Sequence, residues 1–230
     1  MAHRSLTAKL LGSAALLMLA AGLFWGLKVV PADAFQGEVQ RIMYLHVPSV
    51  STAYMAVLVT FCASVLYLWK RDLRFDAVAV SSAEIAVVFF GITLATGAIW
   101  GKPTWGVWWT WDARLTLTAI VFTMYVGYLM LRAFAEDPQA GARYGAVLAI
   151  LGLPAILLNH FAVQWWRTLH QPSSLVRAGG PSVAPVILWP LMFNILAMLV
   201  LYSYLLVERA RLERIRHRAA DTRLKRGRRG

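Results

Sequence analysis

The stretch AVAVSSAEIAVVFFGITLATGAI, residues Ala77–Ile99, decides the fold class of this protein. It contains no basic residue and a single acidic one, Glu84. A helix of about 20 apolar residues is long enough to cross a bilayer. In the whole chain, 59% of the residues are hydrophobic and only 15% are charged. A soluble core cannot hide that much apolar surface behind so few charges, so the sequence predicts an integral membrane protein.

Five further apolar runs lie on either side of this stretch. They cover Leu10–Val30, Ser51–Trp69, Leu115–Leu131, Tyr144–Phe161 and Ala184–Val207. We therefore expect an all-α polytopic membrane protein with about six transmembrane helices in residues 1–207, followed by a basic tail in residues 208–230. The first run is longer than the apolar segment of a signal peptide, so we expect it to be retained, although Ala32-Asp33-Ala34 resembles a cleavage site.

Lysine and arginine predict the orientation of these helices, because they gather on the cytoplasmic side of a membrane. If the N-terminus is inside, the inner segments hold 17 of the 23 Lys and Arg residues and the outer segments hold 6. Ten of them lie in Glu208–Gly230. Both termini and the tail are therefore predicted to be cytoplasmic, in a bacterial inner membrane. A basic tail after a membrane helix is typical of contact with anionic lipid, so we expect no nucleic-acid partner despite the net charge of +12.

With this orientation, three loops form the outer, periplasmic face: Pro31–Val50, Trp100–Arg114 and Ala162–Val183. Nine of the ten tryptophans map to the outer half of the chain, and five of them fall within the segment WGKPTWGVWWTW, residues 100–111. An interfacial belt accounts for one or two tryptophans at each helix end. Because indole rings offer large flat contact areas, this density predicts a platform for a large, flat, apolar ligand.

Two histidines belong to the same outer face. His46 lies in YLHVP, residues 44–48, and His170 lies in WWRTLHQP, residues 165–172. Imidazole is the usual protein ligand of haem iron, and two of them give a six-coordinate centre. We therefore predict a haem site with His46 and His170 as the metal ligands. His160, near the outer end of the fifth run, could replace His170, or could simply cap its helix or pair with Asn159.

Haem carries two propionates, which need cationic partners or water. The outer segments offer Arg41, Lys102, Arg114, Arg167 and Arg177. Arg114 and Arg167 are the candidates to bind propionate, because they lie close in sequence to Trp111 and His170; each could equally meet only lipid headgroups. Asp112 stands directly before the fourth apolar run, where it is predicted to cap the helix and to fix how the tryptophan loop enters the membrane.

Cys62 is the only cysteine, and we expect it to be a small buried apolar residue. The chain has no CxxCH motif, so the predicted haem is b-type and bound without thioether links. Glu84 is an acidic residue inside a predicted span, which makes it a candidate for function. Its position near the inner end of the helix also allows contact with water or with a partner subunit.

The segment WGVWWTWDARLT, Trp105–Thr116, resembles the tryptophan-rich WWD motif of the haem-handling protein superfamily. With six expected spans and little mass outside the membrane, the chain is similar to the smallest common members of that superfamily, the haem exporter protein C (CcmC) family of bacterial cytochrome c maturation. His46-Val-Pro48 and Thr168-Leu-His-Gln-Pro172 match the two histidine segments of the family, and Trp100-Gly-Lys-Pro103 matches the lead-in to its motif.

This resemblance implies that His46 and His170 are axial haem ligands on the periplasmic side. It also implies which residues form the face that holds haem and presents it to the haem chaperone CcmE: Trp105, Trp108, Trp109, Trp111 and Asp112. Further partners implied by the family are the ABC transporter subunits CcmA and CcmB and the small membrane protein CcmD. The expected role is haem delivery for c-type cytochrome biogenesis, in which the protein positions two partners and is no enzyme in the strict sense.

Three other functions fit the sequence less well than haem delivery does. A b-type cytochrome subunit for electron transfer usually places paired histidines inside the helical bundle, whereas His46 and His170 are predicted beside loops. A transport channel needs polar residues along several helices, and these spans contain little beyond scattered Ser, Thr and two Asn residues. A synthetase that joins haem to apocytochrome thiols would need additional spans and a large outer domain.

Overall fold

The computed structural model describes residues 6–172, 174–175 and 179–227, with side chains up to residue 219. The helices are α1 (Leu6–Phe24), α2 (Met43–Lys70), α3 (Leu73–Trp105), α4 (Ala113–Phe134), α5 (Pro138–Ile150), α6 (Gly152–Trp165) and α7 (Pro185–Gly227), with a π-helical turn η1 (Trp25–Val29) and a 3-10 turn η2 (Glu38–Ile42). Within the described residues, six helical segments are long and apolar enough to cross a membrane. The predicted all-α, six-span fold is confirmed.

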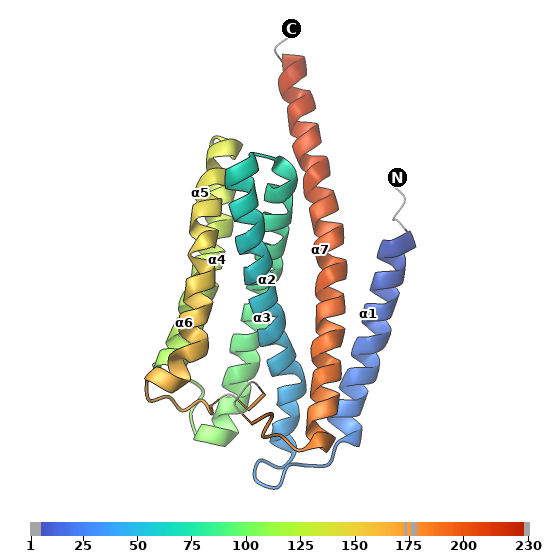
Figure 1. Cartoon of the computed structure of the whole chain (residues 1–230), viewed down its shortest axis with the longest axis vertical. Coiled ribbons are helices and arrows are strands. Elements are labelled where there is room, and N and C mark those ends of the chain that lie inside the picture. The colour runs from blue at the N-terminus through green and yellow to red at the C-terminus, as the bar shows by residue number, and fades with distance from the viewer. Residues whose placement is uncertain (1–5, 173, 176–178, 228–230) are drawn as a thin grey trace.

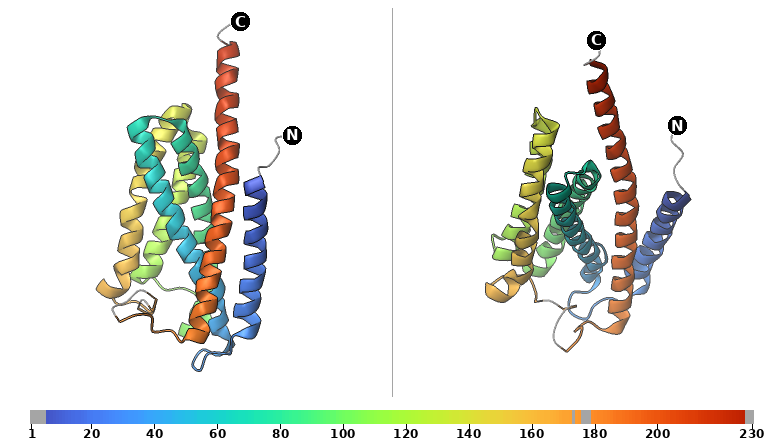
Figure 2. Two further views of the ribbon diagram at one scale, coloured as in Figure 1. Left: turned by 45° about the vertical axis from the view of Figure 1, so that its right-hand side comes forward. Right: turned by 45° about the horizontal axis from the view of Figure 1, so that its top comes forward.

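The helices form an elongated bundle with two different ends (Figure 1). Helices α2 and α3 lie at its centre, α4, α5 and α6 cover one side, and α7 followed by α1 covers the other. Figure 2 shows the same order from two further directions. Both termini point toward one end, and the segments after η1, α3 and α6 all lie at the opposite end, which we call the loop end.

Small side chains let α2 and α3 pack closely along their length. Ala53 and Ala56 of α2 and Ala83 and Ala86 of α3 are fully buried. The hydroxyl of Ser82 donates to the carbonyl of Ala56 on the neighbouring helix, at 2.8 Å. Helices in lipid gain little from hydrophobic burial against each other, so close backbone approach and interhelical hydrogen bonds stabilise this contact.

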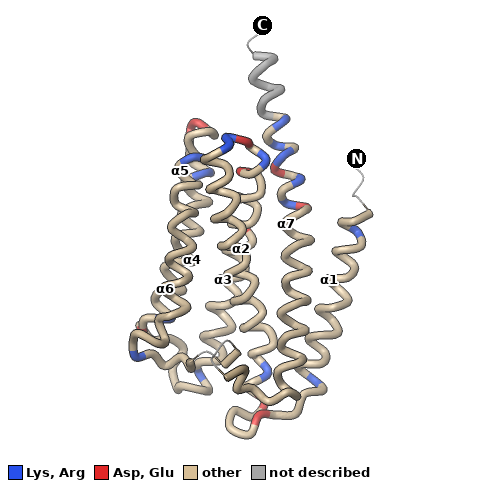
Figure 3. Tube along the Cα trace, viewed as in Figure 1, with Lys and Arg blue, Asp and Glu red and all other residues tan. Residues whose placement is uncertain are grey.

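The end opposite the loops is fastened by ion pairs, and we call it the closed end. Asp76 of α3 and Arg132 of α4 form a two-pronged pair, with nitrogen–oxygen distances of 2.6 and 2.8 Å, and both side chains are largely buried. Figure 3 shows charged residues gathered at this end, where they include the turn between α2 and α3 and the adjoining part of α7. A bidentate guanidinium–carboxylate pair fixes orientation as well as distance, so it locks α3 against α4.

Glu84, the acid inside the third span, contacts another helix of the same chain. Arg209 of α7 donates to its carboxylate from Nε, at 2.7 Å. This ion pair is a simpler account of Glu84 than a role in binding: it neutralises an acid within a membrane-spanning helix and ties α7 to α3.

Two helices begin at the aspartate caps that their sequences offer. Asp72 accepts a hydrogen bond from the backbone N–H of Arg74 at the start of α3. Asp137 accepts from Gln139 and Ala140 at the start of α5, with Pro138 in the first turn. Proline and a capping acid are both favoured at a helix N-terminus, so the tight turns of the closed end follow from local sequence.

The fifth span differs from its prediction as one helix. It divides at Leu151 into α5 and α6, although the two together still cross as one span, Pro138–Trp165. Pro154 explains the division, because it has no N–H to donate to the carbonyl of Ile150 and its ring crowds that carbonyl. Gly152 lies against Tyr125 of α4: an added Cβ would stand 2.6 Å from the tyrosine oxygen.

Two other expectations also need correction. Helix α2 begins at Met43 and α3 continues to Trp105, so parts of the predicted loops Pro31–Val50 and Trp100–Arg114 are helical. Cys62 is exposed on the side of α2 rather than buried, because a bilayer solvates an apolar side chain as well as a protein core does. Helix α7 itself extends to Gly227 and so includes most of the segment predicted as a basic tail, whose place outside the membrane stays a prediction.

Candidate functional site

A cavity of about 350 Å³ opens among the helices toward the loop end. Its volume lies in the range of pockets that enclose cofactors and other small molecules, roughly 300–1,000 Å³. Residues of α2, α3, α4, α6 and the segment before α7 line it, and aromatic side chains form much of the wall: Tyr54, Phe90, Trp100, Trp105 and Trp109. His46, His160 and His170 line the same cavity, so the fold brings together three histidines from distant parts of the chain.

His46 lies near the start of α2, and its ring is oriented by α3. The Oγ1 atom of Thr96 is 3.0 Å from His46 Nδ1. Thr96 donates its own hydroxyl hydrogen to the carbonyl of Ile92, so it accepts the Nδ1 hydrogen of His46. The neutral ring therefore carries its hydrogen on Nδ1, and the ring also contacts the backbone of Thr93. With the hydrogen on Nδ1, Nε2 keeps a lone pair that can bind a metal.

His170 lies between α6 and α7 and has the same tautomer for a different reason. Its Nδ1 is 2.9 Å from the carbonyl oxygen of Gln171, which can only accept. Nδ1 is therefore the donor, and Nε2 is again free. Burial lowers the pKa of His170, and the nearby Arg114 guanidinium lowers it further, so the neutral ring is favoured. Two imidazoles with free Nε2 atoms thus line one cavity, as ligation of a metal from both sides would require.

Asp112 joins three parts of the site. Its Oδ1 accepts from the backbone N–H of Leu115 at 2.9 Å, which confirms the predicted cap of α4. Its Oδ2 accepts from the backbone N–H of Leu169 at 3.1 Å, next to His170. Thr110 also donates to Oδ2, at 3.3 Å. The aspartate of the tryptophan motif therefore holds the loop after α3, the start of α4 and the histidine segment together.

The four tryptophans of the motif divide into two pairs. Trp105 and Trp109 line the cavity, and the Trp105 ring lies 6.4 Å from the His170 ring, centroid to centroid. The indole Nε1 of Trp109 is buried and has no hydrogen-bond partner within the described part of the chain, so it can donate to an anionic ligand. Trp108 and Trp111 are outside the cavity wall and are 58% and 80% exposed, which leaves them available for contacts outside this chain.

The two predicted cationic residues are placed differently. Arg114 lines the cavity, and one guanidinium nitrogen donates to the carbonyl oxygens of Asn159 and His160, at 3.2 and 3.1 Å. Its remaining N–H groups can meet a carboxylate in the cavity. Arg167 is exposed and is not part of the cavity wall. Arg177, another outer cation of the sequence, lies outside the described residues.

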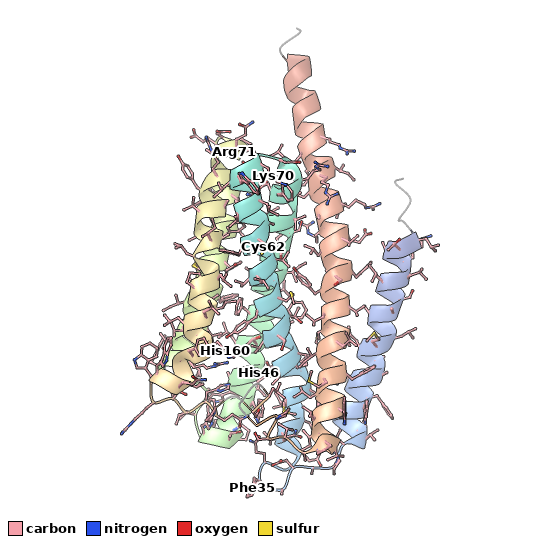
Figure 4. The ribbon with its side chains drawn as sticks, in the orientation of Figure 1. Phe35, His46, Cys62, Lys70, Arg71 and His160 are labelled. Carbon is pink, nitrogen blue, oxygen red and sulfur yellow. The ribbon has the colours of Figure 1, made fainter. Side chains whose placement is uncertain are left out.

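His160 is the alternative ligand that the sequence offered, and it lines the cavity. Figure 4 labels it together with His46. Its ring packs edge-on against Phe161, at 5.2 Å between centroids, and its backbone carbonyl accepts from Arg114. The side chain of Asn159 donates to Thr118 on α4, at 2.8 Å. The expected alternative of a pair between the His160 and Asn159 side chains is therefore replaced by contacts of each residue with other neighbours.

Sequence reasoning missed the residues that orient His46. Thr96 holds Nδ1, and at Gly97 an added Cβ would stand 3.1 Å from His46 Cε1. Trp100 lies edge-on to the same ring at 5.8 Å, and its indole N–H donates to Gln36 at 2.8 Å. Their spacing in the sequence could have predicted this, because in a helix Thr96, Gly97 and Trp100 lie on one face.

Fold and site together define a multi-pass membrane protein with an aromatic cavity in which two imidazole nitrogens are free for a ligand. The cavity fits a flat, largely apolar metal complex with anionic edges: the walls are aromatic, the free Nε2 atoms are metal donors, and Arg114 and Trp109 Nε1 offer hydrogen bonds.

Comparison with known proteins identifies the family. Residues 1–225 match the family described as heme exporter protein C (CcmC). The heme exporter protein C of Haemophilus influenzae is 38% identical over 204 residues, which cover 89% of this chain and 83% of that protein. Those of Bradyrhizobium diazoefficiens and Escherichia coli K12 are 37% and 36% identical, over 93% and 95% of this chain and 82% and 90% of their own lengths. The chain belongs to the heme exporter protein C family.

Proposed function

We propose that this protein binds haem non-covalently in the cavity at the loop end and delivers it to the haem chaperone CcmE during c-type cytochrome biogenesis. Membership of the heme exporter protein C family supports a haem-handling role in this process. The observation that carries the proposal is the pair of free Nε2 atoms, on His46 and His170, in one aromatic cavity.

The residues of this chain would hold haem as cargo. His46 and His170 ligate the iron, Trp105 and Trp109 contact the porphyrin face or edge, and Arg114 binds a propionate. The exposed Trp108 and Trp111 are free to contact the acceptor at the mouth of the cavity. The chain contributes by orienting two partners, and this alone can lower a barrier by several kcal/mol.

We infer that the loop end faces the periplasm. The excess of Lys and Arg on the segments of the closed end supports this orientation (Figure 3). Partner subunits CcmA, CcmB and CcmD belong to the same proposal, supported by the family's place in the Ccm system.

Single cysteines test the orientation. With Cys62→Ala as background, Phe35→Cys places a thiol at the tip of the loop end, where the side chain is 98% exposed, and Lys70→Cys places one at the closed end (Figure 4). A membrane-impermeant maleimide added to intact spheroplasts should label Phe35→Cys and not Lys70→Cys. The opposite labelling would overturn a periplasmic haem site.

The visible spectrum of the purified protein tests haem binding. A Soret band is expected in the wild type and in His160→Ala, and it should weaken or shift in His46→Ala and His170→Ala. If His160→Ala lost the band instead, His160 would be the ligand. If the wild type neither carried haem nor bound added haem, the proposal would fail.

Electron transfer by a resident b-type haem is the second candidate, because His46 lies within a helix of the bundle as such ligands do. The two functions differ in whether the protein releases its haem: a delivery protein does, and an electron-transfer subunit does not. Incubation with purified apo-CcmE should move haem from this protein to the chaperone under delivery, and should leave it in place under electron transfer.

A further inference from the structure

The two candidate ligands are held by different kinds of structure, and His46 is the more firmly seated. Thr96 fixes Nδ1, Gly97 leaves the space that the ring edge occupies, and Trp100 covers the ring from the side. All three residues lie within about one turn of α3, and His46 itself lies on α2. Because α2 and α3 pack along their length, the central helix pair of the bundle fixes this imidazole.

His170 lies on a non-helical segment, residues 167–172, which we call the His170 arm. The hydrogen bond of its Nδ1 to Gln171 stays within the arm, as does the bond from the Thr168 hydroxyl to the His170 carbonyl. Among the described residues, the bond from Leu169 N–H to Asp112 Oδ2 is the one hydrogen bond that ties the arm to another element. Outside the arm, His170 is therefore positioned by one hydrogen bond, from its neighbour Leu169 to Asp112, and by the ring contact with Trp105.

We propose that His46 stays bound to the iron during delivery, that His170 is the ligand that dissociates from it, and that Asp112 positions His170. This inference rests on the proposed haem-binding function. A delivery protein must open a coordination position to the acceptor without losing its cargo to solvent. One ligand seated between two packed helices, and one on an arm that a single hydrogen bond ties to the rest of the protein, meet both needs.

The ligand exchange is balanced without any change in oxidation state. The bond from iron to His170 Nε2 breaks, and a lone pair from a donor atom of the acceptor fills the vacated position. His170 leaves as a neutral ring, with its Nδ1 hydrogen still donated to the Gln171 carbonyl, so no proton or electron has to move.

Asp112→Asn separates the two roles of this residue, the cap of α4 and the acceptor for the Leu169 N–H. Asparagine caps a helix as well as aspartate does, so Oδ1 can still accept from Leu115. The amide NH₂ that replaces Oδ2 cannot accept from Leu169 N–H. Asp112→Ser also keeps the cap and loses the second acceptor. Asp137→Asn, the same change at the cap of α5 on the closed end, is the matched control.

The rate at which carbon monoxide binds to the reduced, haem-loaded protein measures how often a protein ligand leaves the iron. Asp112→Asn and Asp112→Ser should raise this rate about tenfold, since a hydrogen bond to a charged acceptor is lost. Asp137→Asn should leave it unchanged. Thr96→Val should instead speed complete loss of haem to an excess of a haem scavenger, and Thr96→Ser, which keeps the hydroxyl, should restore retention.

A second readout needs no haem. In the apo-protein, amide hydrogen exchange of Leu169 should become faster in Asp112→Asn and Asp112→Ser, and should stay as in the wild type in Asp137→Asn. Unchanged exchange at Leu169 would overturn the positioning role of Asp112.

The outcomes distinguish this inference from the proposed function. If Thr96→Val rather than Asp112→Asn speeds carbon monoxide binding, or if both do so equally, the division of roles is overturned while haem binding stands. The same holds if the haem-loaded Asp112 variants behave like the wild type. A wild type that binds no added haem overturns both proposals.

Discussion

The closed end and the loop end of the bundle differ in the charges that join the helices and in the polar groups left open to a ligand. At the closed end, two charged side chains from neighbouring helices, Asp76 and Arg132, meet in an ion pair with two hydrogen bonds, and short capped turns join the helices. At the loop end, polar groups are left free: the Nε2 atoms of His46 and His170, and the buried Nε1 of Trp109.

The closed end therefore contributes mainly to the stability of the fold, and the loop end mainly to ligand binding. Polar groups that are paired within the chain hold the helices together, and unpaired ones in a cavity cost stability until a ligand satisfies them. Unpaired polar groups at the loop end lower the stability of the protein, and the ion pairs and capped turns of the closed end still fix how the helices pack. Substitutions at the two ends should therefore affect different measurements.

Arg132→Ala should have the largest effect, on stability alone. It removes both hydrogen bonds from Arg132 to the buried Asp76 carboxylate and leaves His217 Nε2, 3.6 Å away, as the remaining ion-pair neighbour. Breaking a buried pair costs about 3–5 kcal/mol. Thermal unfolding in detergent should show a lower midpoint, while haem bound per folded molecule stays unchanged. Arg74→Ala, at an exposed pair of the same end, is the control and should unfold like the wild type. Equal loss in both variants would contradict a special role for the buried pair.

Gly97→Ala should affect the loop end instead. The added Cβ would stand 3.1 Å from His46 Cε1, so the ring has to move, and overpacking of this kind costs about 1–3 kcal/mol, or roughly tenfold in haem affinity. The matched control is Gly91→Ala on the same helix, where the nearest atom, in Phe122, is 3.9 Å away. Haem titration followed by absorbance gives both affinities. If the two variants bind haem equally well, the close fit around His46 is unimportant.

Acid pH provides a test of His170. Burial and the Arg114 guanidinium lower its pKa from the ordinary value of 6.5, so the ring stays neutral and able to ligate as the pH falls through that value. Haem occupancy should therefore hold at pH 6.5 and be lost only below it. Arg114→Gln removes a cation and should let the pKa rise, so occupancy should be lost at a higher pH. A midpoint that stayed in place or fell would contradict this electrostatic coupling.

Trp109→Phe should have a smaller effect. It keeps an aromatic ring in the cavity wall and removes the buried, unpaired Nε1 donor of Trp109, so haem affinity should fall a few-fold, as for one hydrogen bond of about 0.5–1.5 kcal/mol. Trp108→Phe makes the same change at a ring outside the cavity and should alter affinity least of all. If Trp108→Phe weakened binding more than Trp109→Phe, the division of the tryptophans into two pairs would be wrong.

The sequence predicted the features that depend on local chemistry. Long apolar runs specify membrane spans because the bilayer imposes their length, so the number of spans was right. The Asp112 cap was right because a cap involves the next three residues only. Helix ends were less accurate: α2 starts before His46 and α3 runs into the tryptophan segment, since hydropathy does not register a helix that continues with polar or aromatic residues.

The exposure of Cys62 and the break in the fifth span show two further limits. In a bilayer, apolar character does not distinguish a side chain that faces lipid from one that faces the core, so Cys62 was misplaced. The break at Leu151 follows from Pro154, a signal that the sequence carries but that an apolar run conceals.

By itself, the sequence determined that this is a six-span membrane protein with a tryptophan-rich segment and histidines at one end. The tertiary structure decided what those residues can do. Thr96 lies fifty residues from His46 and Asp112 lies fifty-seven from Leu169, and each pair meets only because helices or loops pack side by side. The bond to Thr96 sets which nitrogen of His46 is free, and the bond to Asp112 holds the segment that carries His170, whose own tautomer is set locally by Gln171. The geometry of the two long-range bonds depends on packing and leaves no periodic pattern in the sequence.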